Sequence, residues 1–527
     1  MSLDLTRGEE MFSADKMMKD YLVPGSPMDI FSREIYPLFK DSDFKEMYSE
    51  KGRNGISPAF LAMVTLLQFR ENLSDEEAHA ACSMRIDWKI ALRKPLEERV
   101  EFDPSTLCHF RKRLKENEAM SLILDKTIHL AKEKGFIKKR TNQRIDATHV
   151  IAHVNRISTT DLLFRTVKCV VEEMGKRNPA FWASEVPEDI KERYENDFSS
   201  FGLSKEKRAD RQAEIVEDGL FLKKLWERLP AEARADYVQV AVMDTIFEEN
   251  IVIRKKEIGE KEFIEVEEIE TPKQSIFNPR DPEIKLGIKG RKSWIGSKCH
   301  VVETAGPHGP NIITDMIYQK ATENDNKVLD RQEENNSRLG IDAVKLYCDS
   351  NYLSGEKMAA FEAQGKKLMG YFQADGSSKP KGFKACDFKI DVRGKMATCP
   401  AQHVTTDFSV RGGRIWIRFD ERQCGGCEYF SLCVGEKKKS RDIGVIEHYE
   451  YIQRRRDEQK SDAFRQEMRI RARVEGTISE AVRFHGLRRK KYKGSLGDKL
   501  QFYMTGAAIN IKRMLKAMSE LQRPLLE

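Results

Sequence analysis

Three acidic residues that lie far apart in the sequence are of a type that could do chemistry on phosphates. Asp146 lies near the start of 144–154, a segment rich in β-branched residues that predicts a strand. Asp349 directly follows the short apolar segment 343–348, and Glu475 lies within a helical pattern over 461–484. Mg²⁺ prefers oxygen ligands, and two such ions about 4 Å apart can activate an attacking oxygen and stabilise a leaving one. If the fold brings the three acids together, two-metal phosphoryl transfer follows as a hypothesis.

The elements around Asp349 indicate where that acid lies. The strand 343–348 is followed by a helix through Gln364, a C-cap glycine at Gly365 and a second strand over 367–373. This is a βαβ unit with Asp349 at the carboxyl end of its first strand, where open α/β sheets place their sites. Two further strands, 294–304 and 311–319, are joined by the turn sequence 305–310 and predict a hairpin.

Four cysteines have the spacing of a metal site. Cys424 and Cys427 form a Cys-Gly-Gly-Cys knuckle, and Cys399 and Cys433 flank it. They bracket a hairpin expected at 407–419, and the four thiolates would close a structural zinc site in which His403 could replace one ligand. The alternative is four ordinary cysteines. The other six are expected to be core or surface thiols: Cys82, Cys108, Cys169, Cys299, Cys348 and Cys386.

Two histidines on the first strand invite a metal interpretation that geometry does not support. His149 and His153 are four residues apart, which would place them on one face of a helix. On a strand the same spacing spans roughly 13 Å, too far for one ion. We therefore expect no metal at this pair.

The positive charge is concentrated in one segment. The chain has a net charge of +7, whereas 437–493 alone holds 18 Lys and Arg against 9 Asp and Glu. Such a segment indicates a polyanionic partner, although a solvated helix face would read alike. Arg471 lies four residues before Glu475 on the same helix face, which could also be a weak surface pair. The candidate DNA-binding residues here are Arg471, Arg473, Arg483, Arg488, Arg489, Lys490 and Lys491.

The N-terminal region predicts short helices. One covers 59–70, a second follows the capping pair Ser74 and Glu77, and a third covers about 105–115. The third carries Arg111, Lys112 and Arg113, so the region could be a helix-turn-helix-like DNA-binding domain or a plain bundle.

A length of 527 residues is too long for one compact core, and no apolar run approaches membrane-spanning length. The first ten residues lack a signal-peptide core, so we expect a cytoplasmic protein. The expected divisions are a helical domain over 1–125, a catalytic core over 140–386 with a helical insertion at about 155–240, a cysteine-rich insertion over 387–436 and a basic remainder over 437–527.

Several short motifs together resemble the DDE transposases of bacterial insertion sequences. The motifs are Arg144-Ile-Asp146-Ala-Thr148, Trp294-Ile-Gly296-Ser-Lys298-Cys-His300, Tyr347-Cys-Asp349-Ser-Asn-Tyr352 and Arg471-Ala-Arg473-Val-Glu475-Gly476. The tail from Gly486 to Arg513 and the N-terminal segments around Pro58, Asp75 and Asp103 resemble the same family. The resemblance covers nearly the whole chain except about 155–240.

This resemblance implies an α/β fold with a ribonuclease H-like mixed sheet, an all-α N-terminal domain and a small zinc-ribbon-like insertion. It implies that Asp146, Asp349 and Glu475 form a DDE triad that holds two Mg²⁺ ions for cutting and joining element ends. The partner would be double-stranded DNA, namely terminal inverted repeats and target DNA. The protein would act as a homodimer on paired ends, associated with the bacterial nucleoid.

The sequence departs from the family in one region. Related transposases often have Tyr three residues before the Arg and Lys seven after the Glu, where this chain has Met468 and Val482. Arg473 and Arg483 are candidate substitutes for that phosphate clamp. The alternatives to a transposase are a related nuclease without strand transfer and a domesticated DNA-binding protein that has lost catalysis.

Overall fold

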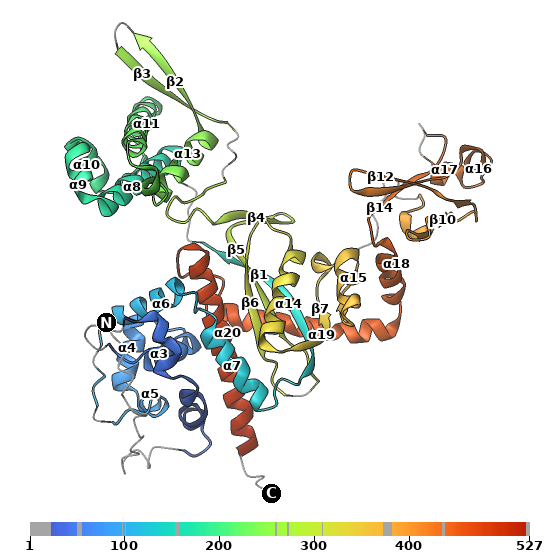
Figure 1. Cartoon of the computed structure of the whole chain (residues 1–527), viewed down its shortest axis with the longest axis horizontal. Coiled ribbons are helices and arrows are strands. Elements are labelled where there is room, and N and C mark those ends of the chain that lie inside the picture. The colour runs from blue at the N-terminus through green and yellow to red at the C-terminus, as the bar shows by residue number, and fades with distance from the viewer. Residues whose placement is uncertain are drawn as a thin grey trace.

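The computed structural model describes residues 23–49, 55–96, 98–100, 102–152, 157–258, 261–270, 273, 275–307, 309–372, 382–434 and 438–522. A central sheet is flanked by N-terminal helices, a separate helical body and a small strand-rich lobe (Figure 1). His153 lies outside the described residues. Among the described helices none is both long and apolar enough to cross a membrane.

The central sheet is mixed and carries the first two acids. Its strands are β1 (Arg140–Ile151), β4 (Lys285–Lys289), β5 (Lys292–Thr304), β6 (Ile313–Lys320), β7 (Asp342–Tyr347) and β8 (Lys367–Met369). The order is β4-β5-β1-β7-β8, and β6 pairs with β5. β5 runs antiparallel to β1, β4 and β6, whereas β7 runs parallel to both β1 and β8.

The expected βαβ unit is present. Helix α15 (Gly355–Ala363) connects the parallel strands β7 and β8, and α14 (Val328–Leu339) precedes β7. Gly365 has a φ of +70°, as a helix-terminating glycine requires. The second strand is shorter than the expected 367–373, because Phe372 leaves the sheet and its backbone N–H donates to Gln459 Oε1 at 3.0 Å.

The N-terminal helices share one hydrophobic core with the last helix of the chain. They are α2 (Pro27–Ile30), α3 (Pro58–Glu71), α4 (Asp75–Met84), α5 (Ile86–Ala91), α6 (Ser105–Glu116) and α7 (Leu122–Glu133). The capping box forms as expected, with Ser74 Oγ accepting from the Glu77 N–H at 3.1 Å. Buried Leu500, Met504 and Ile511 of α20 (Gly494–Gln522) join this core.

Between β1 and β4 the chain forms a helical body with its own core. It comprises α8 (Thr159–Arg177), α9 (Pro179–Glu185), α10 (Glu188–Glu195), α11 (Lys205–Glu227), α12 (Ala231–Arg234) and α13 (Val238–Asn250). The antiparallel hairpin of β2 (Ile251–Ile258) and β3 (Lys261–Glu268) follows and projects from the body (Figure 1). Buried Phe164, Leu222 and Met243 belong to this core, which extends beyond the expected limit near residue 240.

The cysteine-rich lobe contains two small sheets. One is formed by β9 (Lys389–Asp391), β10 (Met396–Thr398) and β11 (Val404–Thr405), the other by β12 (Asp407–Arg411), β13 (Arg414–Arg418) and β14 (Asp442–Val445). The expected hairpin turns at Gly412 and Gly413, both with positive φ. Short helices α16 (Glu421–Gly425) and α17 (Phe430–Cys433) complete the lobe, and α18 (Tyr449–Glu458) leads back to α19 (Asp462–Arg483) at the sheet.

Candidate active site

Asp146, in the middle of β1, lies beside Asp349, which follows the end of β7. The parallel ladder of β1 and β7 pairs Arg144 with Tyr347; Asp146 lies two residues further along β1, and Asp349 lies two residues beyond Tyr347, where β7 ends. Neighbouring strands are about 4.8 Å apart, so the two carboxylates share one edge of the sheet although about 200 residues separate them in the chain. The Asp349 carboxylate also accepts the Ser350 N–H at 2.6 Å, which fixes the turn after β7.

The electrostatics of Asp146 reflect this arrangement. Burial raises the pKa of Asp146, hydrogen bonding to the Ala147 N–H and the charge of Arg471 lower it, and the charge of Asp349 raises it. A carboxylate whose proton affinity is raised by burial and by a neighbouring carboxylate lies where a cation binds favourably.

Helix α19 brings the third acid to the same place. Arg471 Nη1 lies 3.4 Å from Asp146 Oδ2, and Arg471 Nη2 lies 3.8 Å from Glu475 Oε1. The Glu475 side chain is 64% exposed, whereas the Arg471 side chain is 24% exposed. One guanidinium therefore links the acid on β1 to the acid on α19.

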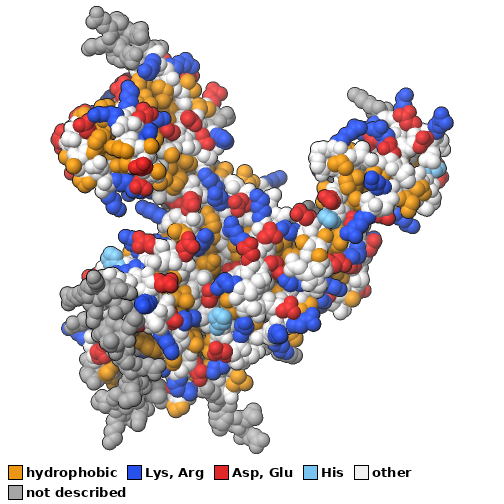
Figure 2. Space-filling model, in the orientation of Figure 1, with side chains coloured by type: hydrophobic (Ala, Val, Ile, Leu, Met, Phe, Trp, Pro, Cys, Tyr) orange, Lys and Arg blue, Asp and Glu red, His pale blue; other side chains and the backbone are white. Residues whose placement is uncertain are grey.

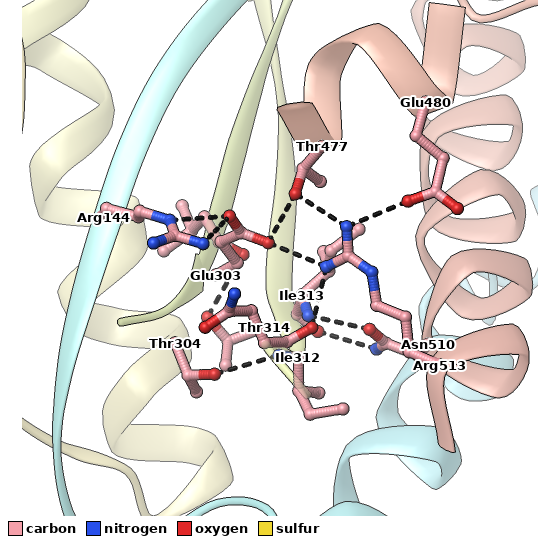
Figure 3. Close-up of polar contacts among 12 residues, drawn as sticks. Arg144, Glu303, Thr304, Ile312, Ile313, Thr314, Thr477, Glu480, Asn510 and Arg513 are labelled. Atoms are coloured by element: carbon pink, nitrogen blue, oxygen red, sulfur yellow. Dashed lines mark hydrogen bonds and ion pairs between the residues drawn. The ribbon is translucent and has the colours of Figure 1, made fainter. Parts of the chain in front are cut away.

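A buried carboxylate fastens α19 to the sheet (Figure 3). Glu303 on β5 is fully buried and accepts from Arg144 Nε at 2.7 Å. Its other oxygen accepts from Thr477 Oγ1 at 2.8 Å. Arg144 lies two residues before Asp146, and Thr477 lies two residues after Glu475, so Glu303 connects the backbone segments that carry both acids.

The same network reaches the last helix. Arg513 on α20 donates to Glu303 Oε2 at 2.9 Å, to Thr477 Oγ1 at 2.7 Å and to Glu480 Oε2 at 3.0 Å (Figure 3). Arg144 Nη1 also donates to the carbonyl of Ile470 at 3.2 Å. The buried charge of Glu303 is thus compensated by donors on three elements, β1, α19 and α20, as a buried ion requires.

A second buried contact holds the turn that carries Asp349. His300 Nδ1 lies 2.6 Å from the Tyr352 hydroxyl, and His300 Nε2 lies 3.0 Å from Gln319 Oε1. Burial lowers the pKa of His300 to about 4, so the ring is neutral. The sequence offered a signal, because His300 and Tyr352 end two of the motifs that carry the family resemblance, but it did not indicate that the two side chains are in contact.

The candidate DNA-binding residues of the basic segment fall into two groups. Arg473, Arg483 and Arg489 are exposed, and Arg473 and Arg483 pair with no acid in the described part of the chain. Lys490 is buried, with Nζ 2.7 Å from Asp281 Oδ2 and 3.2 Å from Asp498 Oδ2. Lys490 is therefore enclosed in this structure and cannot reach a phosphate without rearrangement.

Arg488 and Lys491 have partners that leave part of each side chain accessible. Arg488 Nη2 lies 3.3 Å from Thr148 Oγ1 on β1, and Lys491 Nζ lies 2.8 Å from Asn72 Oδ1 at the end of α3. Neither is neutralised by an acid in these contacts. On the face seen in Figure 2, Lys and Arg are interspersed with Asp and Glu.

Helix α6 presents fewer charges than its sequence indicates. Arg111 is buried, and its Nη2 lies 2.6 Å from Asp75 Oδ2. Arg113 stacks over Tyr48 at 4.6 Å from the ring centroid. Lys112 is exposed and near Glu116 at 3.6 Å. Arg111 is unavailable for DNA because its guanidinium is paired with Asp75 between α6 and α4. Lys112 is the most accessible of the three.

The four cysteines of the small lobe line one cavity of about 20 Å³ together with His403. Burial raises the pKa of Cys424, and the neighbouring thiols Cys399 and Cys427 raise it further. The His403 N–H also donates to Cys399 Sγ at 3.3 Å. Converging thiols around a small void fit the donor set of a zinc ion.

As placed here, no three of the described His, Cys, Asp or Glu side chains form a ready metal site, either at the acids or at the cysteines. At the acids Arg471 lies within the space between Asp146 and Glu475. The donor chemistry nevertheless fits a hard divalent cation, because three carboxylates come from three elements that meet at one sheet edge.

Two family models match parts of the chain. The Transposase domain (DUF772) model matches residues 18–113, and the Transposase DDE domain model matches residues 398–515. The second match contains Glu475 and the four cysteines of the small lobe. No curated protein and no solved structure matches the chain. The two matches together cover less than half of the chain, and they support a DDE transposase of the insertion-sequence type; proteins with such domains act on DNA and in general use divalent metals such as Mg²⁺.

Proposed function

We propose that this protein cleaves DNA at the ends of its insertion element and joins those ends to target DNA by a two-metal mechanism. The observation that carries the proposal is the placement of Asp146 beside Asp349 at one sheet edge, with Arg471 linking Asp146 to Glu475 on α19. The order of the strands supports a ribonuclease H-like core, since an antiparallel β6-β5-β1 unit continues into the parallel strands β7 and β8.

In this proposal Asp146, Asp349 and Glu475 hold two Mg²⁺ ions. When bound, these ions would activate the attacking oxygen and stabilise the leaving oxygen of the phosphodiester. Glu303 and His300 hold the elements that carry the acids, through Arg144 and Tyr352 respectively. Arg471 would release the acids when the metal ions bind and then be free to contact a phosphate.

The DNA would lie along the exposed Arg473, Arg483 and Arg489 of α19 and the turn that follows it, with the partly accessible Arg488 beside them. Exposed guanidiniums position a duplex through its phosphates whatever its sequence. Helix α6 would add a second contact through Lys112. Cys399, Cys424, Cys427 and Cys433 would hold a structural zinc ion that orders the small lobe. We further propose action as a homodimer on paired ends, within the bacterial cytoplasm.

The test is cleavage of a DNA fragment that flanks the gene, in the presence of Mg²⁺. Asp349→Asn should abolish cleavage while leaving binding to the same fragment nearly unchanged. Asp342→Asn is the matched control, because Asp342 is an exposed acid on the same strand β7 and should retain activity. Cleavage by Asp349→Asn at the wild-type rate would overturn the assignment.

The products distinguish the alternatives. Joined products in an excess of target plasmid support a transposase, whereas cleavage without joining supports a nuclease. Binding without cleavage by the wild-type protein would indicate a domesticated DNA-binding protein.

A further inference from the structure

The hairpin formed by β4 and β5 ends in a cluster of basic residues. Its tip contains Lys289, Arg291 and Lys292, with Gly290 at a φ of +61° forming the turn. All three basic side chains are exposed, and none makes an ion pair or a side-chain hydrogen bond with a described residue. The tip therefore carries three positive charges without a compensating acid in the described part of the chain.

The hairpin curls back over β1 instead of continuing straight. His149 pairs with Lys298 in the β1–β5 ladder, yet the ring of Trp294 lies 5.1 Å from the ring of His149. Four residues of straight strand would carry Trp294 roughly 13 Å away. The bend occurs at Gly296, which has a φ of +155° and where an added Cβ would lie 1.9 Å from the carbonyl oxygen of Val150. Only glycine permits this close approach.

The curled hairpin is held firmly. Trp294 pairs with Gly287 across the hairpin, and a Cβ at Gly287 would lie 2.3 Å from the indole ring. The ring is thus enclosed between Gly287 and His149. A strand interior that contains glycine at such a position indicates close packing of a large neighbour. The hairpin that carries the basic tip therefore packs against β1, the strand that contains Asp146.

The charges of the tip lie near His149, three residues after Asp146 on β1, because the hairpin packs against His149 through Trp294. Burial lowers the pKa of His149, and the charges of Arg488, Lys289 and Lys292 lower it further. Arg488 approaches from the turn after α19 and is held there by backbone pairing, since the Ile151 N–H donates to its carbonyl at 2.7 Å. Like charges gathered in this way repel each other unless an anion joins them.

We infer that the β4–β5 hairpin is a clamp that, together with Arg488, binds backbone phosphates of the DNA strand next to the phosphate that is cleaved. The inference rests on the proposed function for the identity of the anion as DNA. Lys289 and Lys292 on the hairpin and Arg488 after α19 all place positive charge near His149. None of the hairpin residues belongs to the basic segment 437–493, so the hairpin adds a second element to the contact that Arg488 makes.

The first experiment measures binding of a fluorescent 30-base-pair duplex of arbitrary sequence, with Ca²⁺ in place of Mg²⁺ so that the DNA stays intact. The variant carries Lys289→Ala and Lys292→Ala. We expect roughly tenfold weaker binding at moderate salt, and a slope of log K against log salt that is shallower by about 2, since each lost phosphate contact removes about 0.9. The control is Lys516→Ala, an exposed lysine on α20 that should leave both quantities unchanged. A wild-type slope in the double variant would overturn the inference.

The second experiment locates the contact. Single neutral methylphosphonates are placed around the cleavage position of the gene-flanking fragment, once that position has been mapped. Wild-type binding should weaken for substitutions within a few nucleotides of the cleaved phosphate, and the double variant should be insensitive to those same substitutions. Equal sensitivity of both proteins would contradict the clamp. If the wild-type protein does not cleave the fragment, that result counts against the proposed function instead. The salt slopes of the first experiment would still test whether the hairpin binds phosphates.

Discussion

Arg471 Nη1 lies 3.4 Å from Asp146 Oδ2, and the same guanidinium extends towards Glu475. The arginine thus supplies, within the protein, the positive charge that two neighbouring carboxylates need. A metal ion that binds between these acids has to displace this charge or share the acids with it. Arg471 therefore opposes metal binding in the absence of DNA.

Replacing Arg471 with Gln should strengthen metal binding. Removal of one unit charge at this distance is expected to lower the dissociation constant for Mn²⁺ about fivefold, which corresponds to about 1 kcal/mol. Electron paramagnetic resonance titration of free Mn²⁺ measures this directly. Arg469→Gln is the control, because Arg469 is exposed on the same helix and pairs with no acid among the described residues. Equal affinities in both variants would show that Arg471 does not oppose the metal.

The buried Glu303 network should dominate the stability of the core. Glu303→Gln leaves Arg144 and Arg513 without their shared carboxylate, and removal of one partner of a buried ion pair costs about 3–5 kcal/mol. Thr477→Val removes a single buried hydrogen bond and should cost about 1–3 kcal/mol. Urea unfolding monitored at the core transition measures both. Glu520→Gln, an exposed glutamate near Lys516, serves as control and should change little. A change below 1 kcal/mol for Glu303→Gln would contradict this account.

Stability should also depend on pH through Asp315. Burial raises the pKa of Asp315 to about 7, and the nearby charge of Asp125 raises it while Arg338 lowers it. In the unfolded chain the pKa of an aspartate is about 3.9. The folded state therefore favours the protonated acid, and this contribution is fully present below about pH 4 and is lost as the pH rises towards 7 and beyond.

Asp315→Asn should remove the loss of folding stability at high pH. The amide keeps an oxygen that can accept the Met316 N–H, as the wild-type carboxylate does at 2.8 Å. We expect the variant to be more stable than the wild-type protein at pH 8, by up to about 4 kcal/mol, and to differ little at pH 4. Urea unfolding at the two pH values measures the difference. If the stability difference between the variant and the wild-type protein were the same at pH 4 and pH 8, Asp315 would not titrate in this range.

The cysteine lobe should contain one zinc ion per chain. Elemental analysis of the purified protein measures the zinc content, and Cys424→Ser should lose the metal because the thiolate is one of four ligands. Cys108→Ser is the control, an exposed cysteine on α6 outside the lobe. If His403→Ala also lost the zinc, the histidine would be a ligand in place of one cysteine. Wild-type protein that contains no zinc would leave the lobe as a purely hydrophobic unit.

Local pattern was sufficient to predict the elements that carry the three acids. The strand with Asp146 is rich in β-branched residues, the strand before Asp349 is short and apolar, and the helix with Glu475 has a helical hydrophobic period. Turn positions were equally readable, because Gly365, Gly412 and Gly413 adopt the positive φ that their places in the sequence predict.

Contacts between distant segments were not predictable in the same way. The sequence around Arg111 and Lys490 predicts surface charges. In the fold Arg111 is enclosed where α6 packs on α4, and Lys490 is enclosed where its turn packs against Asp281. Glu303 lies in an apolar strand, where nothing local indicates that three elements share its carboxylate. The bend at Gly296 depends on the carbonyl of Val150, a residue on another strand. Each of these features is a property of packing, which a single sequence does not reveal.

The measurement that tests the central claim most directly is metal rescue of cysteine variants. Asp146→Cys, Asp349→Cys and Glu475→Cys should each be inactive in Mg²⁺, which binds thiolates poorly, and should recover part of their DNA cleavage in Mn²⁺, which tolerates a softer ligand. Glu467→Cys is the control, because Glu467 lies on the same helix but pairs with Lys345 and Tyr347, so it should cleave in both metals. Recovery in all three variants is the result that one shared metal site predicts. Full Mg²⁺-dependent cleavage by any of the three would contradict it.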